Sequence, residues 1–178
     1  LGFDDGSFSK SDKEVIVVGV VLRGNSGVEG VLSTKIAVDG LDSTEELAKL
    51  VNSSKHKGQL RAIMIQGTTL GGLNIVDLNS LFSKIRIPIL GIIRKKPSEE
   101  ILKAVEKVHD KKKRLEILES NGEVYKYRKL YFQMAGLKLH EAYEVIDKSF
   151  GRANMPECLR LAHLIASGIT LGESRGRA

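Results

Sequence analysis

Residues Val15 to Val38, with the sequence VIVVGVVLRGNSGVEGVLSTKIAV, decide the fold. Val15 to Leu22 is a near-continuous apolar run rich in β-branched side chains, which is typical of a buried strand. Arg23 to Gly27 has the composition of a turn, and Val31 to Val38 returns as a second strand. Leu1 to Asp4 indicates an earlier strand, so we expect three strands in an antiparallel meander.

The apolar spacing then becomes helical, and strands and helices alternate. The pattern predicts, in order, a helix from Asp42, a strand at Leu60–Ile65, a helix at Leu73–Phe82, a strand at Ile87–Ile93, a helical stretch from Pro97 to Asn121, one or two strands within Val124–Met134, and helices at Leu139–Phe150 and Pro156–Ile169. Strand–helix–strand units require parallel pairing through right-handed crossovers. We therefore predict an α/β fold with a ribonuclease H-like, five-stranded mixed sheet flanked by helices. A doubly wound nucleotide-binding fold fits less well, because no helix separates the first three strands.

Length and composition narrow the class of protein. The 178 residues suit one domain, residues 1–178, and no apolar stretch approaches the roughly 20 residues of a membrane-spanning helix. Cys158 is the single cysteine, so we expect a reducing, cytoplasmic location and a buried thiol. Because the first residue is Leu1, we expect that the natural N-terminus lies upstream.

The charge permits a polyanionic partner. The net charge is +6 and the pI is about 9.4, a mild basic excess that is compatible with nucleic-acid binding. The basic residues gather at Arg94–Lys96, at Lys111–Arg114, and at Arg175 and Arg177. We interpret Lys111–Arg114 mainly as solvated side chains at a helix end.

Acidic and amide side chains follow the predicted strands. Asp4 and Asp5 end the first strand, Asp39 ends the third, and Gln66 ends the fourth. Ligands of such sheets gather beyond the carboxyl ends of the parallel strands. Converging carboxylates could hold one or two Mg²⁺ or Mn²⁺ ions and support phosphodiester hydrolysis. Turn formation explains the same residues, since Asp39-Gly40 and Asp5-Gly6 are turn pairs.

Several of these strings are similar to a known family. Gly2-Phe3-Asp4-Asp5-Gly6, Val38-Asp39-Gly40 and Asn74 to Asp77 resemble an uncharacterised archaeal family of unknown function related to endonuclease V, over essentially the whole chain. The Pro156-to-His163 helix, after a Leu-x-Glu-Ala segment at Leu139 to Ala142, is the most specific match. The resemblance implies an endonuclease V-like fold and a metal-dependent nuclease.

The resemblance also implies site residues. Asp4 matches the metal-binding aspartate of the first strand, and Asp39 falls where endonuclease V has an active-site glutamate. His163 falls where a late helix brings a polar group to the metal. Arg94 matches an active-site lysine, which makes it and Lys95 candidate phosphate contacts. Gln66 occupies the position of a strand-four aspartate.

The chain departs from the endonuclease V pattern at several points. Gln66 contributes an amide oxygen in place of a carboxylate, which weakens a two-metal site. Ala135-Gly136-Leu137 replaces a Pro-Gly-His-like turn, and we find no copy of the aromatic wedge motif. Recognition of hypoxanthine is therefore not implied.

Three functions remain open from the sequence. The first is a nuclease that uses Mg²⁺ or Mn²⁺, with Asp4, Asp39 and His163 as catalytic residues and Asp4, Asp5, Asp39 and Gln66 around the metal. The second is a catalytically inactive protein on the same fold that binds DNA or RNA through its basic runs. The third is a site for a small phosphorylated ligand, because Gly67–Gly72 is glycine-rich and precedes a predicted helix.

Overall fold

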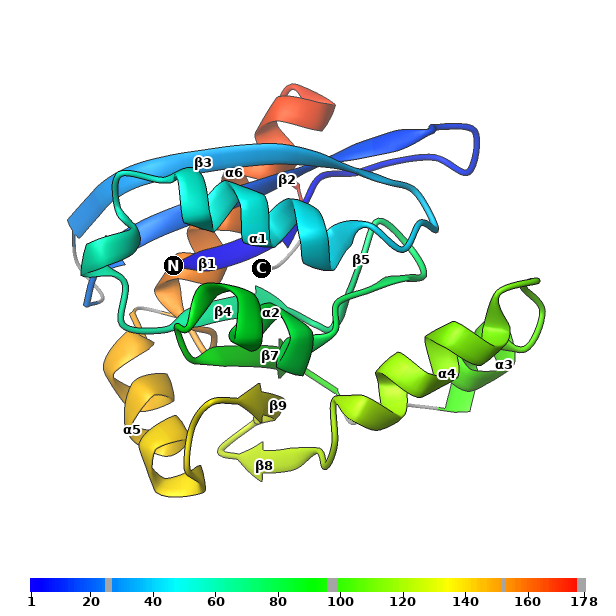
Figure 1. The fold of residues 1–178 in the computed structure, drawn as a ribbon. Coiled ribbons are helices and arrows are strands. Elements are labelled where there is room, and N and C mark those ends of the chain that lie inside the picture. Colours follow the sequence, from blue (N-terminus) through cyan, green and yellow to red (C-terminus); the bar gives the residue numbers. More distant parts are fainter. Residues whose placement is uncertain (25–26, 96–98, 152, 176–178) are drawn as a thin grey trace.

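A mixed seven-stranded sheet forms the centre of the computed structural model, which describes residues 1–24, 27–95, 99–151 and 153–175 (Figure 1). Its strands are β1 (Gly2–Asp5), β2 (Glu14–Arg23), β3 (Gly27–Ala37), β4 (Ile63–Gln66), β7 (Ile89–Ile93), β8 (Tyr125–Tyr127) and β9 (Leu130–Ala135). Their order is β3-β2-β1-β4-β7-β9-β8. β1, β2 and β3 form the predicted antiparallel meander, and β1, β4 and β7 pair in parallel.

The prediction of five strands was wrong by two. β9 pairs antiparallel with β7, and β8 pairs antiparallel with β9. Both strands come from the segment Val124–Met134, which the sequence already indicated as extended. Without them the buried strand β7 would end the sheet with unpaired backbone groups, which is unfavourable for an apolar strand.

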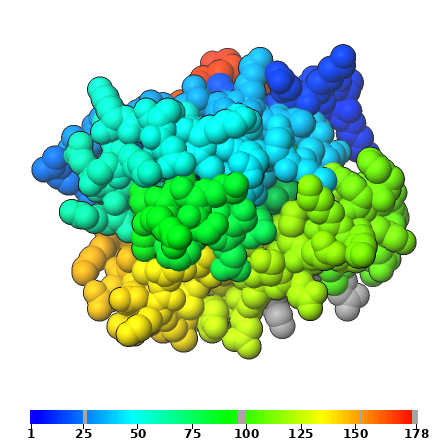
Figure 2. All heavy atoms as spheres, viewed as in Figure 1, coloured from blue at the N-terminus to red at the C-terminus, as the bar shows by residue number. Residues whose placement is uncertain are grey.

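Helices cover both faces of the sheet. The helical elements are α1 (Ser43–Ser53), the 3₁₀ turn η1 (Lys57–Gln59), α2 (Leu78–Ile85), α3 (Glu99–Val105), α4 (Lys111–Ser120), α5 (Leu139–Ser149) and α6 (Glu157–Leu171). α1 and α2 lie on one face, and α6 packs against β1, β2 and β4 on the other (Figure 1). α3 and α4 project from the edge where β7 ends, beside the layer formed by α1 and α2 (Figure 2).

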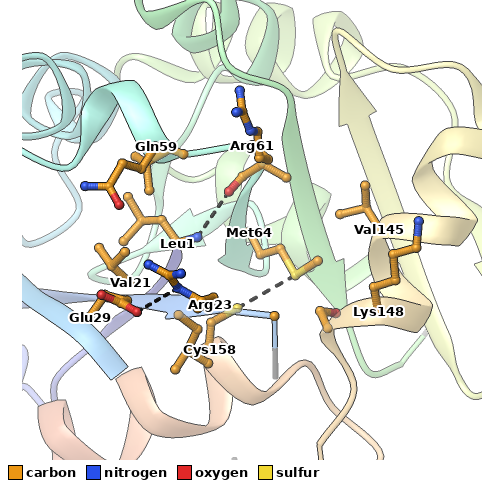
Figure 3. Close-up of a pocket in the computed structure, with 15 residues that line it drawn as sticks. Leu1, Val21, Arg23, Glu29, Gln59, Arg61, Met64, Val145, Lys148 and Cys158 are labelled. Atoms are coloured by element: carbon orange, nitrogen blue, oxygen red, sulfur yellow. Dashed lines mark hydrogen bonds and ion pairs between the residues drawn. The ribbon is translucent and has the colours of Figure 1, made fainter. Parts of the chain in front are cut away.

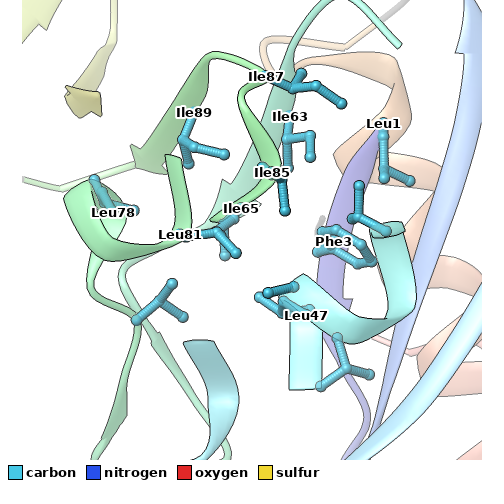
Figure 4. Packing of buried hydrophobic residues seen from close by; sticks show 14 of the residues in the cluster. Leu1, Phe3, Leu47, Ile63, Ile65, Leu78, Leu81, Ile85, Ile87 and Ile89 are labelled. Atoms are coloured by element: carbon cyan, nitrogen blue, oxygen red, sulfur yellow. The ribbon is translucent and has the colours of Figure 1, made fainter. Parts of the chain in front are cut away.

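The main core lies between the sheet and the α1–α2 layer. Phe3 and Ile65 from neighbouring parallel strands meet Leu47 of α1 and Leu81 of α2, and all four side chains are fully buried (Figure 4). Burying each such side chain contributes about 1.5–3 kcal/mol. This packing fixes the strands whose carboxyl ends carry the candidate site.

The helix predicted at Leu73–Phe82 begins later than expected. Residues Thr69–Leu70 and Asn74–Ile75 instead form a small antiparallel hairpin, β5 and β6. The Asn74 amide holds this hairpin: its oxygen accepts from Ser43 N at 3.0 Å, and its nitrogen donates to Asp42 Oδ1 at 2.6 Å. Asp77 then caps α2 by accepting from Ser80 N at 2.9 Å.

Arg114 is a buried side chain, which corrects its interpretation as solvated. It is 3% exposed and forms an ion pair with Asp110 at 2.7 Å. Its guanidinium also donates to the backbone carbonyls of Asp39, Gly40 and Leu73. Lys111, Lys112 and Lys113, by contrast, are exposed as predicted. Arg114 therefore fastens α4 to two loops at the edge where β3 and β6 lie.

Candidate functional site

A recess of about 360 Å³ lies at the carboxyl ends of β1 and β4. Its described lining residues are Asp4, Asp5, Gly6, Ser7, Phe8, Gln66, His163 and Ser167. β1 supplies the two aspartates, β4 supplies Gln66, and α6 supplies His163 and Ser167, which are four residues apart and share a helix face. Parallel pairing of β1 with β4 is what brings the first three together.

Asp4 and His163 form the central contact of the recess. Asp4 is 3% exposed, and its Oδ2 lies 2.9 Å from His163 Nδ1. His163 Nε2 lies 3.2 Å from the backbone carbonyl of Arg175, which can only accept a hydrogen bond. The two ring nitrogens of His163 thus link Asp4 on β1 to the backbone that follows α6.

The two aspartates are electrostatically strained. Burial, followed by the neighbouring charge of Asp5, raises the pKa of Asp4 to about 7, and this value already includes the lowering effect of His163. Burial also raises the pKa of Asp5, against the lowering effect of its hydrogen bond from Gly71 N at 2.7 Å. A cation between these carboxylates would relieve the strain.

Gln66 presents a buried acceptor without a partner. Its Oε1 is the one buried side-chain oxygen or nitrogen of the described ranges that has no hydrogen bond. An unsatisfied buried acceptor costs about 1–3 kcal/mol. Such an atom in a recess with two carboxylates fits a role as a ligand of a hard cation.

The structure does not bring Asp39 into this recess. Asp39 has a positive φ of 52°, and its Oδ1 accepts from Leu73 N at 2.7 Å. Its backbone N donates to Gly71 O at 2.7 Å, and Gly71 N in turn donates to Asp5. Asp39 thus contacts the site only through the loop that orients Asp5.

Arg94 and Lys95 follow β7 at the same edge of the sheet, and both are exposed. Desolvation lowers the pKa of Arg94, and the carboxylate of Asp4 acts in the opposite direction, as expected for a guanidinium within electrostatic reach of that acid. Lys96, Pro97, Ser98 and Arg177 lie outside the described residues.

Three features of the site were missed by the sequence analysis. Phe8 and Ser167 line the recess, and Ser167 could have been found from its spacing to His163 on one helix face. The Gly71 amide that holds Asp5 has no local sequence signal, because it depends on the hairpin between Gln66 and α2.

The glycine-rich segment Gly67–Gly72 does not form a free phosphate cradle. Gly67 N donates to Ile92 O at 2.7 Å, and Gly71 N donates to Asp5. The hairpin and the Asp77 cap separate this segment from the start of α2. This geometry disfavours the small-phosphate interpretation.

A second cavity of about 420 Å³ lies at the opposite ends of β1 and β4 (Figure 3). Its wall is mostly apolar, with Leu1, Val21 and Met64 among its residues. Cys158 is buried there, as predicted, with Sγ 3.9 Å from Met64 Sδ. The groups that suit hydrolytic chemistry lie in the other recess.

The metal-ligating capacity of the chain is limited. Across residues 1–24, 27–95, 99–151 and 153–175, no three Asp, Glu, His or Cys side chains are grouped so that they could hold a metal ion. The recess offers two carboxylates and the Gln66 amide oxygen. This set fits one hard cation completed by water and does not fit a pair of ions.

Comparison with known proteins assigns the family. A family model described as Endonuclease dU matches residues 1–170. The chain belongs to the Endonuclease dU family. It is 42% identical to a UPF0215 protein of Methanothermobacter thermautotrophicus over 184 residues, which cover 100% of this chain and 90% of the relative. The archaeal relationship predicted from the sequence is confirmed.

Solved structures confirm the fold of this Endonuclease dU family member. A protein of unknown function from Archaeoglobus fulgidus superposes with a TM-score of 0.89 at 39% identity, over 94% of this chain and 95% of that one. Bacillus subtilis endonuclease V gives a TM-score of 0.64 at 12% identity, over 96% and 80%. Ciona intestinalis endonuclease V, in complex with DNA containing an inosine, gives 0.61 at 13% identity, over 96% and 84%. The endonuclease V-like fold is therefore shown.

No helix in the described part of the chain has the length and hydropathy to cross a membrane.

Proposed function

We propose that the chain is a divalent-metal-dependent endonuclease that hydrolyses phosphodiester bonds in nucleic acid. The observation that carries this proposal is the recess in which the buried Asp4 pairs with the half-buried His163 beside the unpartnered Gln66 Oε1. An endonuclease V-like fold and membership of the Endonuclease dU family support the reaction class.

Asp4, Asp5 and Gln66 would hold one Mg²⁺ or Mn²⁺ ion. The bound ion would supply Lewis acidity to a phosphoryl oxygen and lower the pKa of water. Asp39 is assigned a positioning role, because its carboxylate holds the loop whose Gly71 amide orients Asp5.

His163, Arg94 and Lys95 complete the proposed site: the first positions the Asp4 carboxyl group, and the other two supply positive charge. His163 orients the Asp4 carboxyl group through its Nδ1, while the Arg175 carbonyl positions its Nε2. Arg94 and Lys95 stand at the end of β7, where they can neutralise the phosphate being cleaved.

The substrate class follows from the family name. Since dU is the standard abbreviation for deoxyuridine, DNA that contains deoxyuridine is the substrate class we propose. The Ciona structure shows that a related fold accommodates DNA in that protein.

The test combines metal binding with cleavage. Calorimetric titration of Mn²⁺ and Mg²⁺ into the natural chain should show binding that Asp4→Asn abolishes. Cleavage of a deoxyuridine-containing oligonucleotide should require the metal, stop in EDTA, and be lost in Asp4→Asn. Glu119→Gln, an exposed acid on α4, is the matched control and should retain both properties.

A catalytically inactive binding protein is the alternative outcome. It would give nucleic-acid binding that falls steeply with salt, without metal binding and without cleavage. Metal binding that survives in Asp4→Asn would contradict the assigned site.

A further inference from the structure

Phe8 is an unusual aromatic side chain in this molecule. The chain has nine aromatic residues, five Phe and four Tyr, and all of them lie in the described ranges. Eight are buried or half-buried, whereas Phe8 is exposed at 36%. Part of this ring is therefore free to contact a ligand, which distinguishes Phe8 from the other aromatic residues.

Phe8 lies at the recess that holds the candidate catalytic groups. It lines this recess together with Asp4, Gln66 and His163. Among the lining residues that the structure describes, Phe8 is the one with a large apolar side chain, and the other side chains with functional groups are polar or charged. Gly72 lies beside it, and a Cβ added at Gly72 would come 3.7 Å from Phe8 Cζ.

The loop that carries Phe8 is held on both sides of the ring. On the N-terminal side, Ser7 N donates to Thr170 Oγ1 of α6 at 3.1 Å. On the C-terminal side, Ser9 N donates to Asp12 Oδ2 at 2.7 Å, and Asp12 N donates to Ser9 O at 3.1 Å. Because the backbone is held on both sides of Phe8, contact with a ligand would cost little entropy for ordering the loop.

A ligand that suits this arrangement has a flat π face next to an anion. The ring offers a stacking surface, and Arg94 directly follows β7, the parallel neighbour of the strand that supplies Gln66. We propose that Phe8 forms a nucleobase-stacking subsite at the rim of the recess, where a base adjacent to the scissile phosphate packs on its ring. This inference rests on the proposed function, and it names the part of the substrate that the site holds besides the phosphate.

Stacking of this kind is tolerant of base identity, because every base has a π face. Phe8 therefore contributes affinity and alignment, and other groups select the base. Phe8→Ala and Phe8→Leu should both weaken binding of single-stranded oligonucleotides about 5- to 150-fold. Phe8→Tyr should retain binding, since the ring is kept.

The absence of tryptophan from the chain gives a direct readout. Phe8→Trp would place the only indole of the protein at the subsite. Its emission should be quenched when a single-stranded oligonucleotide binds in EDTA, where cleavage cannot occur. A deoxyribose-phosphate oligomer of the same length without bases should bind through its phosphates and leave the emission unchanged. Val31→Trp, at a position that is 51% exposed on β3, is the matched control and should report no quenching.

The outcomes separate the two proposals. Fluorescence anisotropy of labelled oligonucleotides measures binding independently of the indole. Binding without quenching of the Phe8→Trp emission, or full affinity in Phe8→Leu, overturns the stacking subsite and leaves the nuclease proposal standing. Absence of binding to any nucleic acid overturns both.

Discussion

His163 Nδ1 lies 2.9 Å from Asp4 Oδ2, which joins the first strand of the sheet to its last helix across 159 residues of sequence. The contact ties together two of the segments whose motifs resemble the endonuclease V-related family. Burial at this contact raises the pKa of Asp4, so the stability of the fold depends on pH.

The unfolding free energy of the metal-free protein should fall as the pH rises from about 4 to about 7. The pKa of Asp4 is raised from 3.8 to about 7, so the folded state binds more protons than the unfolded state in this window. Asp5 acts in the same direction. Urea denaturation at about pH 5 and about pH 8 in EDTA measures the effect. Asp4→Asn should flatten the profile, and a parallel profile in that variant would contradict the assignment.

Gln66→Asp should raise the affinity for Mn²⁺ by about tenfold or more, because it adds a formal negative charge to the ligand set. Calorimetry compares the variant with the natural chain. Gln59→Asp makes the same chemical change at an exposed residue of η1, at the other end of the sheet, and should leave the affinity unchanged. Equal gains in both variants would indicate a general charge effect.

Arg114→Ala should destabilise the fold by about 3–5 kcal/mol, because it leaves Asp110 and three loop carbonyls without their partner. Arg114→Lys should restore little of the lost stability. The ammonium group of lysine lacks the planar guanidinium that donates to several acceptors at once. Urea denaturation gives the values. Lys112→Ala, on the exposed side of the same turn, should change stability by less than about 0.5 kcal/mol.

Gly72→Ala should cost more stability than Gly122→Ala, although both positions have positive φ. Left-handed backbone strain, about 1–2 kcal/mol, is common to the two variants. Only at position 72 does the added Cβ meet a neighbour, at 2.3 Å from Asp39 Oδ1, whereas nothing lies within 4 Å at position 122. Thermal denaturation of the pair isolates the clash. Equal losses would mean that the Asp39 loop yields freely.

The sequence predicted the parts of the fold that depend on local pattern. The apolar run Val15–Leu22 identified β2, and the change to helical spacing at Asp42 identified α1. The pairing of β9 with β7 was missed, because the local sequence of an extended segment does not indicate which strand it will pair with. The helix expected from Leu73 begins at Leu78, since Asn74 uses its amide for long-range hydrogen bonds.

For the site, too, the sequence predicted what depends on local pattern and missed what depends on long-range contacts. Asp4, Asp5, Gln66 and His163 line one recess, as strand topology and the resemblance led us to expect. Asp39 lies at a strand end too, but its left-handed backbone turns its carboxylate to the Leu73 amide. Arg114 has one local partner, Asp110, but its burial gave no signal, because its other partners are backbone carbonyls far away in sequence.

The hydrogen bond from Gly71 N to Asp5 has a consequence for how this site tolerates mutation. An anchor made by a side chain disappears with a single substitution, but a main-chain amide persists in every residue except proline. The position is further restricted to glycine by its φ of 55° and by Val15 Cγ1, 2.8 Å from where a Cβ would lie. Random substitution at this edge of the sheet would therefore remove the Asp5 carboxylate before it removed the Gly71 amide that orients it.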